Sequence, residues 1–148
     1  MRALLQRVTE AAVTVDGAAV GAIGHGLLVL LCAEHGDTGD NARYIAGKIA
    51  RMRLFPDADG KTNLSVLDVK GAALVVSQFT LAADWRKGNR PGFSRAAAPD
   101  AAKALYERFC ALLAAEGVPV ETGRFAASMQ VSLVNDGPFT IWMDSKET

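Results

Sequence analysis

The sequence contains few of the side chains that usually act as catalytic nucleophiles or bind metal ions. Of its 148 residues, two are cysteines and two are histidines. Cys32 and Cys110 do not form a CxxC pair, so we expect two buried thiols rather than a disulfide or a metal site. His25 and His35 lack carboxylates at the spacing typical of a metal site. We therefore predict that the protein binds no metal ion, and we expect no cofactor.

The chain also lacks net charge, because 16 basic and 16 acidic residues cancel. It does not have the basic excess that is typical of general nucleic-acid binding. A nucleic-acid partner would need a local basic patch, and the best candidate is the run with Arg86, Lys87 and Arg90, to which Arg51 and Arg53 could add. Taken alone, such a run is more often a solvated loop.

Long apolar runs are absent as well. None reaches the roughly 18 residues that a membrane span needs, and the longest, residues 26–33, has the length of a strand. Met1 leads directly into a strand pattern, without the apolar core and cleavage site of a signal peptide. We expect a cytoplasmic protein with no membrane partner, whose residues 1–148 form one domain.

The residues that are present predict strands, interrupted by two helices. Strand patterns cover residues 3–8, 12–15, 18–23 and 26–33, and Asp16-Gly17 between two of them indicates a hairpin. Ile45, Ile49 and Met52 recur at helical spacing within residues 40–53. Asp37, Thr38 and Asp40 are candidate caps of that helix.

The second half repeats this plan. A strand runs from Ala72 into residues 77–81, a loop follows at 84–99, and a helix starts near Pro99 and stops near Gly117. Its expected core stripe is Leu105, Phe109, Leu112 and Leu113. Strands near 118–121, 129–134 and 139–143 complete the chain. The order predicts a single compact α+β domain, with a mainly antiparallel rolled sheet or β-barrel and two main helices.

Two short motifs stand at the ends of predicted strands, where sites are usually built. The first is Ser77-Gln78-Phe79-Thr80, and the second is the NDGPFT stretch at 135–140. Neither contains cysteine or histidine. Any chemistry at these motifs would rest largely on backbone geometry.

The two motifs resemble the signatures of the D-aminoacyl-tRNA deacylases. The stretches at 1–8, 63–66 and 86–91 are similar to the same family, in the same order, so the likeness spans essentially the whole chain. It implies a homodimer with active sites at the interface, which hydrolyses D-aminoacyl-tRNA to tRNA and the free D-amino acid. It also implies clearance of glycine mischarged on alanine tRNA.

The resemblance implies a catalytic role for residues 77–80. The amides of Phe79 and Thr80 would stabilise the negative oxygen that forms when water attacks the ester. Ser77 and Gln78 would fix this loop and hold the substrate. Two mechanisms stay open: backbone donors assisted by the 2′-hydroxyl of the terminal adenosine, which we favour, and nucleophilic attack by the Thr80 hydroxyl.

The resemblance also assigns chiral selection to Gly137 and Pro138. Sequence alone favours a trans bond between them, whereas in the family this bond is cis and the dipeptide enters the partner's site. The two carbonyl groups would then form a wall that excludes an L side chain, and Arg7 would brace it. A solvent-facing arginine on an alternating strand is the alternative for Arg7.

Phe125 and Met129 match family positions that line the adenosine pocket, although by pattern alone both are core residues. The likeness further favours contact between RNA and the run with Arg86, Lys87 and Arg90. The chain departs from the common family pattern at Phe139, which shifts the motif or fills neighbouring core, and at Ser128, where a polar contact would be weaker or lost.

Two other functions compete with the deacylase. One is a nucleic-acid-binding module without catalysis on the same fold, and the other is a general small-ester hydrolase with Thr80 as nucleophile.

Overall fold

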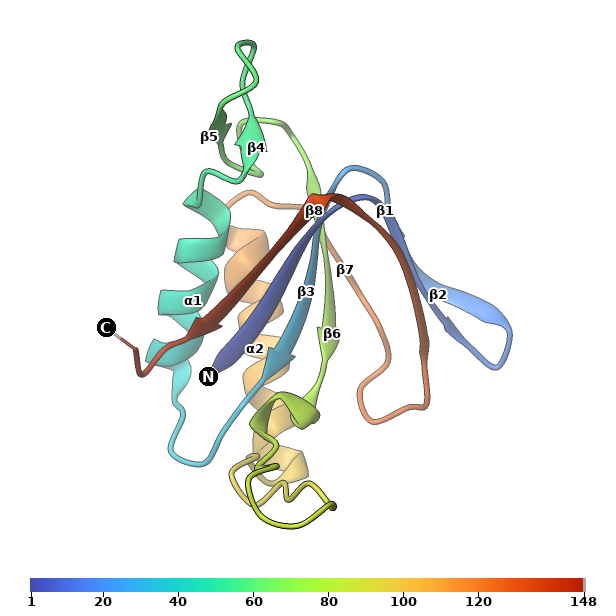
Figure 1. The fold of residues 1–148 in the computed structure, drawn as a ribbon, viewed down its shortest axis with the longest axis vertical. Helices are drawn as coiled ribbons and strands as arrows, with labels where there is room; N and C mark the ends of the chain where they lie inside the picture. The colour runs from blue at the N-terminus through green and yellow to red at the C-terminus, as the bar shows by residue number, and fades with distance from the viewer. Residues whose placement is uncertain (148) are drawn as a thin grey trace.

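Strand β1 (Arg2–Val15) organises the sheet in the computed structural model, which describes residues 1–147 (Figure 1). Strand β8 (Gln130–Asp144) pairs antiparallel along one side of β1. On its other side, β1 pairs antiparallel with β3 (Gly26–Cys32) near its start and with β2 (Ala18–Ile23) near its end. The two strands expected at 3–8 and 12–15 are therefore one continuous strand.

The hairpin between β1 and β2 confirms the turn predicted from Asp16-Gly17. Both residues have positive φ, 50° at Asp16 and 79° at Gly17. Aspartate and glycine are among the residues that accept this conformation, and two positive φ angles are what a tight hairpin turn requires.

The far half of the sheet is parallel, so the expectation of a mainly antiparallel sheet holds only for the pairings of β1. Strand β6 (Ala72–Ser77) pairs in parallel with β3 and with β7 (Val120–Thr122). Helical crossovers cause this, because parallel neighbours need long connections. Helix α1 (Gly39–Arg51) and the small hairpin of β4 (Phe55–Pro56) and β5 (Thr62–Leu64) connect β3 to β6, and α2 (Pro99–Ala115) connects β6 to β7.

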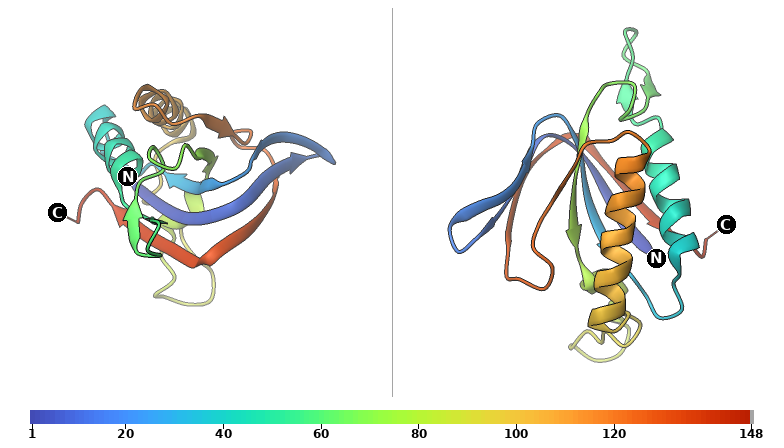
Figure 2. Two further views of the ribbon diagram at one scale, coloured as in Figure 1. Left: turned by 90° about the horizontal axis from the view of Figure 1, so that it is seen from above. Right: turned by 180° about the vertical axis from the view of Figure 1, so that it is seen from behind.

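The sheet curls until its two ends almost meet. Gly21 in β2 lies against the main chain of β7, so closely that a β-carbon at this position would overlap the carbonyl oxygen of Thr122. Only glycine allows this approach. The result is a nearly closed mixed sheet with two helices, related to the expected barrel but with mixed strand directions (Figure 2).

Both helices cover the same face of the sheet (Figure 2). Ile45 and Ile49 of α1 and Phe109 and Leu113 of α2 pack there against the apolar side of β1, β3 and β6. Strand β3 is buried on both faces, as its unbroken apolar run predicts, because Leu28 points into a second cluster with residues of β1, β6 and β8.

The helix ends confirm the sequence signals. Thr38 caps α1 in a capping box with Asn41. Pro99 opens α2, and Gly117 follows its end with a φ of 103°. No helix within residues 1–147 is long and apolar enough to cross a membrane.

Candidate functional site

A cavity of about 810 Å³ opens beside the end of β6. Five of the predicted site residues line it: Ser77, Gln78, Phe79, Phe125 and Met129. They come from the end of β6, from the turn that follows it and from the segment before β8. The fold thus brings together residues about 50 positions apart.

The segment predicted to be catalytic is a turn rather than the extension of a strand that the sequence predicts at 77–81. Strand β6 ends at Ser77, and residues Phe79–Ala82 form the 3₁₀ turn η1. The backbone amide of Gln78 donates the last hydrogen bond between β6 and β3, to the Leu31 carbonyl at 2.8 Å. The chain then turns because the amides of Leu81 and Ala83 bond back to the carbonyls of Gln78 and Thr80.

This turn leaves two neighbouring backbone donors free, one on Phe79, which lines the cavity, and one on Thr80, which does not. The amides of Phe79 and Thr80 are the first of η1, where a helical turn offers no internal acceptor. Within residues 1–147, neither amide donates to another group. Adjacent free amides of this kind can stabilise an anion or a developing oxyanion.

Several contacts hold the turn in place. Arg2 donates from Nη1 to the Leu81 carbonyl at 2.8 Å, and the Cys32 thiol lies 3.6 Å from the Phe79 carbonyl. Gln78 donates from Nε2 to the hydroxyl of Thr80. The Thr80 hydroxyl therefore faces an amide group, which is not a base.

The cavity is also lined by residues that the sequence analysis did not assign to it, among them Cys32, His35, Phe93 and Tyr106. Tyr106 is buried and donates to the Val75 carbonyl at 2.7 Å. Burial raises the pKa of its hydroxyl well above the usual range. Tyr106, Phe109 and Leu113 share one helical face, and this spacing was the available signal.

The thiol of Cys32 is a weak nucleophile in this setting. Burial, followed by the nearby Glu34 carboxylate, raises its pKa to about 11. The thiol is therefore protonated at neutral pH, whereas the thiolate is the reactive form.

The NDGPFT motif lies in a bulge of β8. The pairing with β1 shifts between Gln6↔Thr140 and Val8↔Asn135, so residues 136–139 leave the ladder. Asn135 closes the bulge, because its Oδ1 accepts from the Phe139 amide at 2.7 Å and its Nδ2 donates to the Thr140 hydroxyl at 2.9 Å. The Gly137–Pro138 peptide bond is cis, and both residues are exposed.

Arg7 contacts the base of this bulge. Its Nε donates to the Asp136 carbonyl at 2.9 Å and its Nη1 to the Leu54 carbonyl at 2.6 Å. The guanidinium also lies over the Phe139 ring, 4.7 Å from its centroid. Arg7 is thus not a solvent-facing arginine. Of its two carbonyl partners, Asp136 directly precedes the dipeptide and Leu54 lies before β4, so neither belongs to the dipeptide. Phe139 packs against the helix-side core, and Ser128 is exposed.

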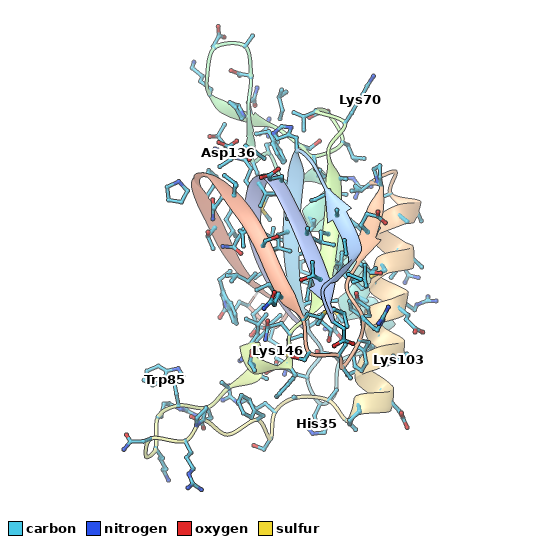
Figure 3. All side chains as sticks on the ribbon, turned by 90° about the vertical axis from the view of Figure 1, so that its right-hand side faces the viewer. His35, Lys70, Trp85, Lys103, Asp136 and Lys146 are labelled. Carbon is cyan, nitrogen blue, oxygen red and sulfur yellow. The ribbon has the colours of Figure 1, made fainter. Side chains whose placement is uncertain are left out.

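The bulge and the cavity lie at opposite ends of the molecule. Figure 3 shows Asp136 at one end of the sheet and the cavity residue His35 at the other. Gly137 and Pro138 do not line the cavity of their own chain. Any joint action of the two motifs would require two chains.

The predicted basic patch is smaller than the sequence suggests. Arg86 forms a two-pronged pair with the Asp84 carboxylate, both distances being 2.8 Å, and this holds the pKa of Asp84 well below its usual range. Arg51 pairs with Glu116 at 2.6 Å. Lys87 and Arg90 are exposed and form no ion pair within residues 1–147. Residues 1–147 also contain no group of three or more His, Cys, Asp or Glu side chains that could hold a metal ion.

The comparison with known proteins agrees with the motifs. The family model described as D-Tyr-tRNA(Tyr) deacylase matches residues 4–144. A protein named D-aminoacyl-tRNA deacylase from Ruegeria pomeroyi is 66% identical over 97% of this chain and 99% of its own. One of the same name from Dinoroseobacter shibae is 63% identical, with the same coverage.

Two solved structures share the fold. One, described as a c-Myc DNA unwinding element binding protein, is 40% identical with a TM-score of 0.91 and covers 97% of this chain and 98% of its own. The other, a probable eukaryotic D-amino acid tRNA deacylase, is 21% identical with a TM-score of 0.81, covering 96% of this chain and 97% of its own. The family model and the high-identity relatives confirm the predicted family: the chain belongs to the D-Tyr-tRNA(Tyr) deacylase family.

Proposed function

We propose that the protein hydrolyses the ester bond of D-aminoacyl-tRNA and releases tRNA and the D-amino acid. The observation that carries this proposal is the pair of free amides of Phe79, which lines the 810 Å³ cavity, and of its neighbour Thr80. Relatives that are 66% and 63% identical over almost the whole chain carry the name of this activity.

The geometry fits acyl transfer to water. The ester carbonyl accepts hydrogen bonds from the two amides, water adds to the carbonyl carbon, and the C–O bond to the ribose breaks. The leaving ribose oxygen takes the proton that the water gives up, with the neighbouring 2′-hydroxyl as the relay. Phe125 and Met129 supply an apolar surface for the terminal adenosine.

Turnover tests this function. Purified protein at a hundredth of the concentration of D-Tyr-tRNA should release most of the D-tyrosine, because each molecule acts repeatedly. Release limited to background hydrolysis, together with tight tRNA binding, would instead identify a binding module. The 40%-identical structure named for DNA binding makes that candidate worth testing, although the net charge of zero weighs against it.

Thr80→Ala should retain at least about half of the wild-type kcat. The partner of its hydroxyl is the Gln78 amide group, which cannot act as a base, and alanine keeps the backbone donor. Single-turnover hydrolysis of D-Tyr-tRNA checks this. A folded Thr80→Ala protein that loses activity by a factor of about 1,000 would assign the chemistry to the hydroxyl and revive the small-ester hydrolase.

We further propose a homodimer in which Gly137 and Pro138 of one chain enter the cavity of the other. The two residues are exposed, project from a bulge, and lie at the far end of their own chain from its cavity. Arg7 of β1 supports the bulge through its contacts with the Asp136 carbonyl and the Phe139 ring. Steric exclusion of L side chains by the dipeptide would leave glycine acceptable, including glycine mischarged on alanine tRNA.

A mixed dimer tests this arrangement. One chain carries Phe79→Pro, which removes a catalytic amide, and the other carries Pro138→Ala, which should admit L-Tyr-tRNA. If the dipeptide acts across the interface, the heterodimer contains one wild-type site and one site with both changes, so L-Tyr-tRNA is spared. If the dipeptide acts within its chain, the heterodimer cleaves L-Tyr-tRNA at about half the rate of the Pro138→Ala homodimer.

A tRNA substrate leads to two further expectations, on the residues that contact RNA and on the location of the protein. Lys87 and Arg90 are the basic residues best placed to contact tRNA phosphates, and Arg86 supports their loop through Asp84. A tRNA substrate also favours a cytoplasmic location.

A further inference from the structure

Trp85 is the most exposed of the large apolar side chains described in residues 1–147, at 76%. It lies on the loop at residues 84–92, and Figure 3 shows its ring directed away from the body of the protein. A single exposed apolar residue is ordinary on a protein surface. Any role for Trp85 therefore depends on the residues around it.

The loop is fixed at its base. The amide of Asp84 donates to the Gly92 carbonyl at 2.7 Å, and the amide of Gly92 donates back to the Asp84 carbonyl at 2.9 Å. The Asp84 carboxylate also accepts from the Arg86 backbone amide at 3.2 Å and from its guanidinium. Trp85 lies between these two residues, so its backbone is held on both sides.

The loop that carries Trp85 contains three cations, Arg86, Lys87 and Arg90, and one anion, Asp84. Arg86 neutralises the carboxylate of Asp84. Lys87 and Arg90 make no ion pair within the described residues. An aromatic face beside uncompensated cations is the combination that binds single-stranded nucleic acid, because bases stack on the ring while the cations contact phosphates.

The loop also starts and ends at the rim of the cavity. Phe79, in the turn that leads into the loop, and Phe93, which follows it, both line the cavity. Their rings meet edge to face with centroids 5.0 Å apart. A chain of nucleotides that leaves the cavity over this rim would meet the loop next.

We propose that Trp85 stacks on an unpaired base of the tRNA 3′ end, next to the terminal adenosine, while Lys87 and Arg90 contact the adjoining phosphates. This assignment depends on the proposed function, since it takes the terminal adenosine to occupy the cavity. Trp85 is then a substrate-binding residue outside the catalytic pocket.

Two substrates separate this role from catalysis. With D-Tyr-tRNA, Trp85→Ala should raise KM about tenfold, which corresponds to a stacking energy within the usual range, and kcat should stay the same. Trp85→Phe should recover most of the loss. With D-tyrosine esterified to adenosine alone, wild type and Trp85→Ala should react equally, because no neighbouring base is present.

Fluorescence gives a direct signal of stacking. Trp142 is the only other tryptophan, so a Trp142→Phe protein reports on Trp85 alone. Uncharged tRNA should quench its emission, and a tRNA lacking its unpaired 3′ nucleotides should not.

Three results would overturn the assignment. One is an unchanged KM for D-Tyr-tRNA in Trp85→Ala, together with no quenching of the tryptophan emission of the Trp142→Phe protein by tRNA. Another is conversion of a Trp85→Ala dimer to monomers, which would place the indole between two copies of the chain. If wild type cleaves neither substrate, the proposed function fails and the assignment with it, whereas an active wild type with an indifferent Trp85→Ala refutes the stacking role alone.

Discussion

Phe79→Pro is expected to lower kcat for D-Tyr-tRNA by about 100- to 1,000-fold, the usual cost of losing one oxyanion donor. Proline removes the amide of the first residue of η1, which donates no hydrogen bond within residues 1–147. The first position of a helical turn tolerates proline well. The preceding residue, Gln78, has φ −141° and ψ 81°, which is not helical and is therefore compatible with a following proline.

Phe79→Ala is the matched control, because it removes the same ring and keeps the amide. The ring is 56% exposed and contacts Phe93, so its loss should have a small effect on kcat. Single-turnover rates and the thermal midpoints of both variants are needed. Equal rates in two folded variants would show that the Phe79 amide does not contribute to the reaction.

Gly26→Ala should destabilise the protein by about 3 kcal/mol, at the upper end of the usual cost of overpacking. Gly26 pairs with Ala72 where β3 meets β6. An added β-carbon would overlap the Ala72 carbonyl oxygen and lie 2.8 Å from the Ala72 nitrogen. Both obstacles are main-chain atoms, so the start of β6 must move, and β6 carries Ser77 to the cavity.

Gly24→Ala provides the comparison, because a β-carbon there would have no atom within 4 Å. Urea unfolding of the two variants measures the difference. A Gly26→Ala protein as stable as Gly24→Ala would contradict the close parallel pairing of β3 with β6.

Short sequence patterns predicted the turns and helix ends that depend only on neighbouring residues. Asp16-Gly17 specified its hairpin, Pro99 marked the start of α2, and one of the three candidate caps, Thr38, starts α1. The placement of Ser77 to Phe79 beside Phe125 and Met129 came from the resemblance, since pattern alone assigned the last two to the core.

Features that depend on long-range pairing were missed. Periodicity shows that β6 is buried but not which strands flank it, so its parallel partners were not predicted. The turn at Phe79 begins where the hydrogen bonds between β6 and β3 end, with the bond from the Gln78 amide to the Leu31 carbonyl. The pair between Asp84 and Arg86 was missed because two residues in a loop show no periodic pattern.

The most direct test of the central claim compares wild-type hydrolysis of D-Tyr-tRNA, Gly-tRNA and L-Tyr-tRNA, prepared on the same tRNA where the chemistry allows. We predict rapid release of D-tyrosine and glycine, and release of L-tyrosine no faster than without protein. Hydrolysis of L-Tyr-tRNA at a rate similar to that of D-Tyr-tRNA would contradict chiral selection, and hydrolysis of none of the three would contradict the deacylase.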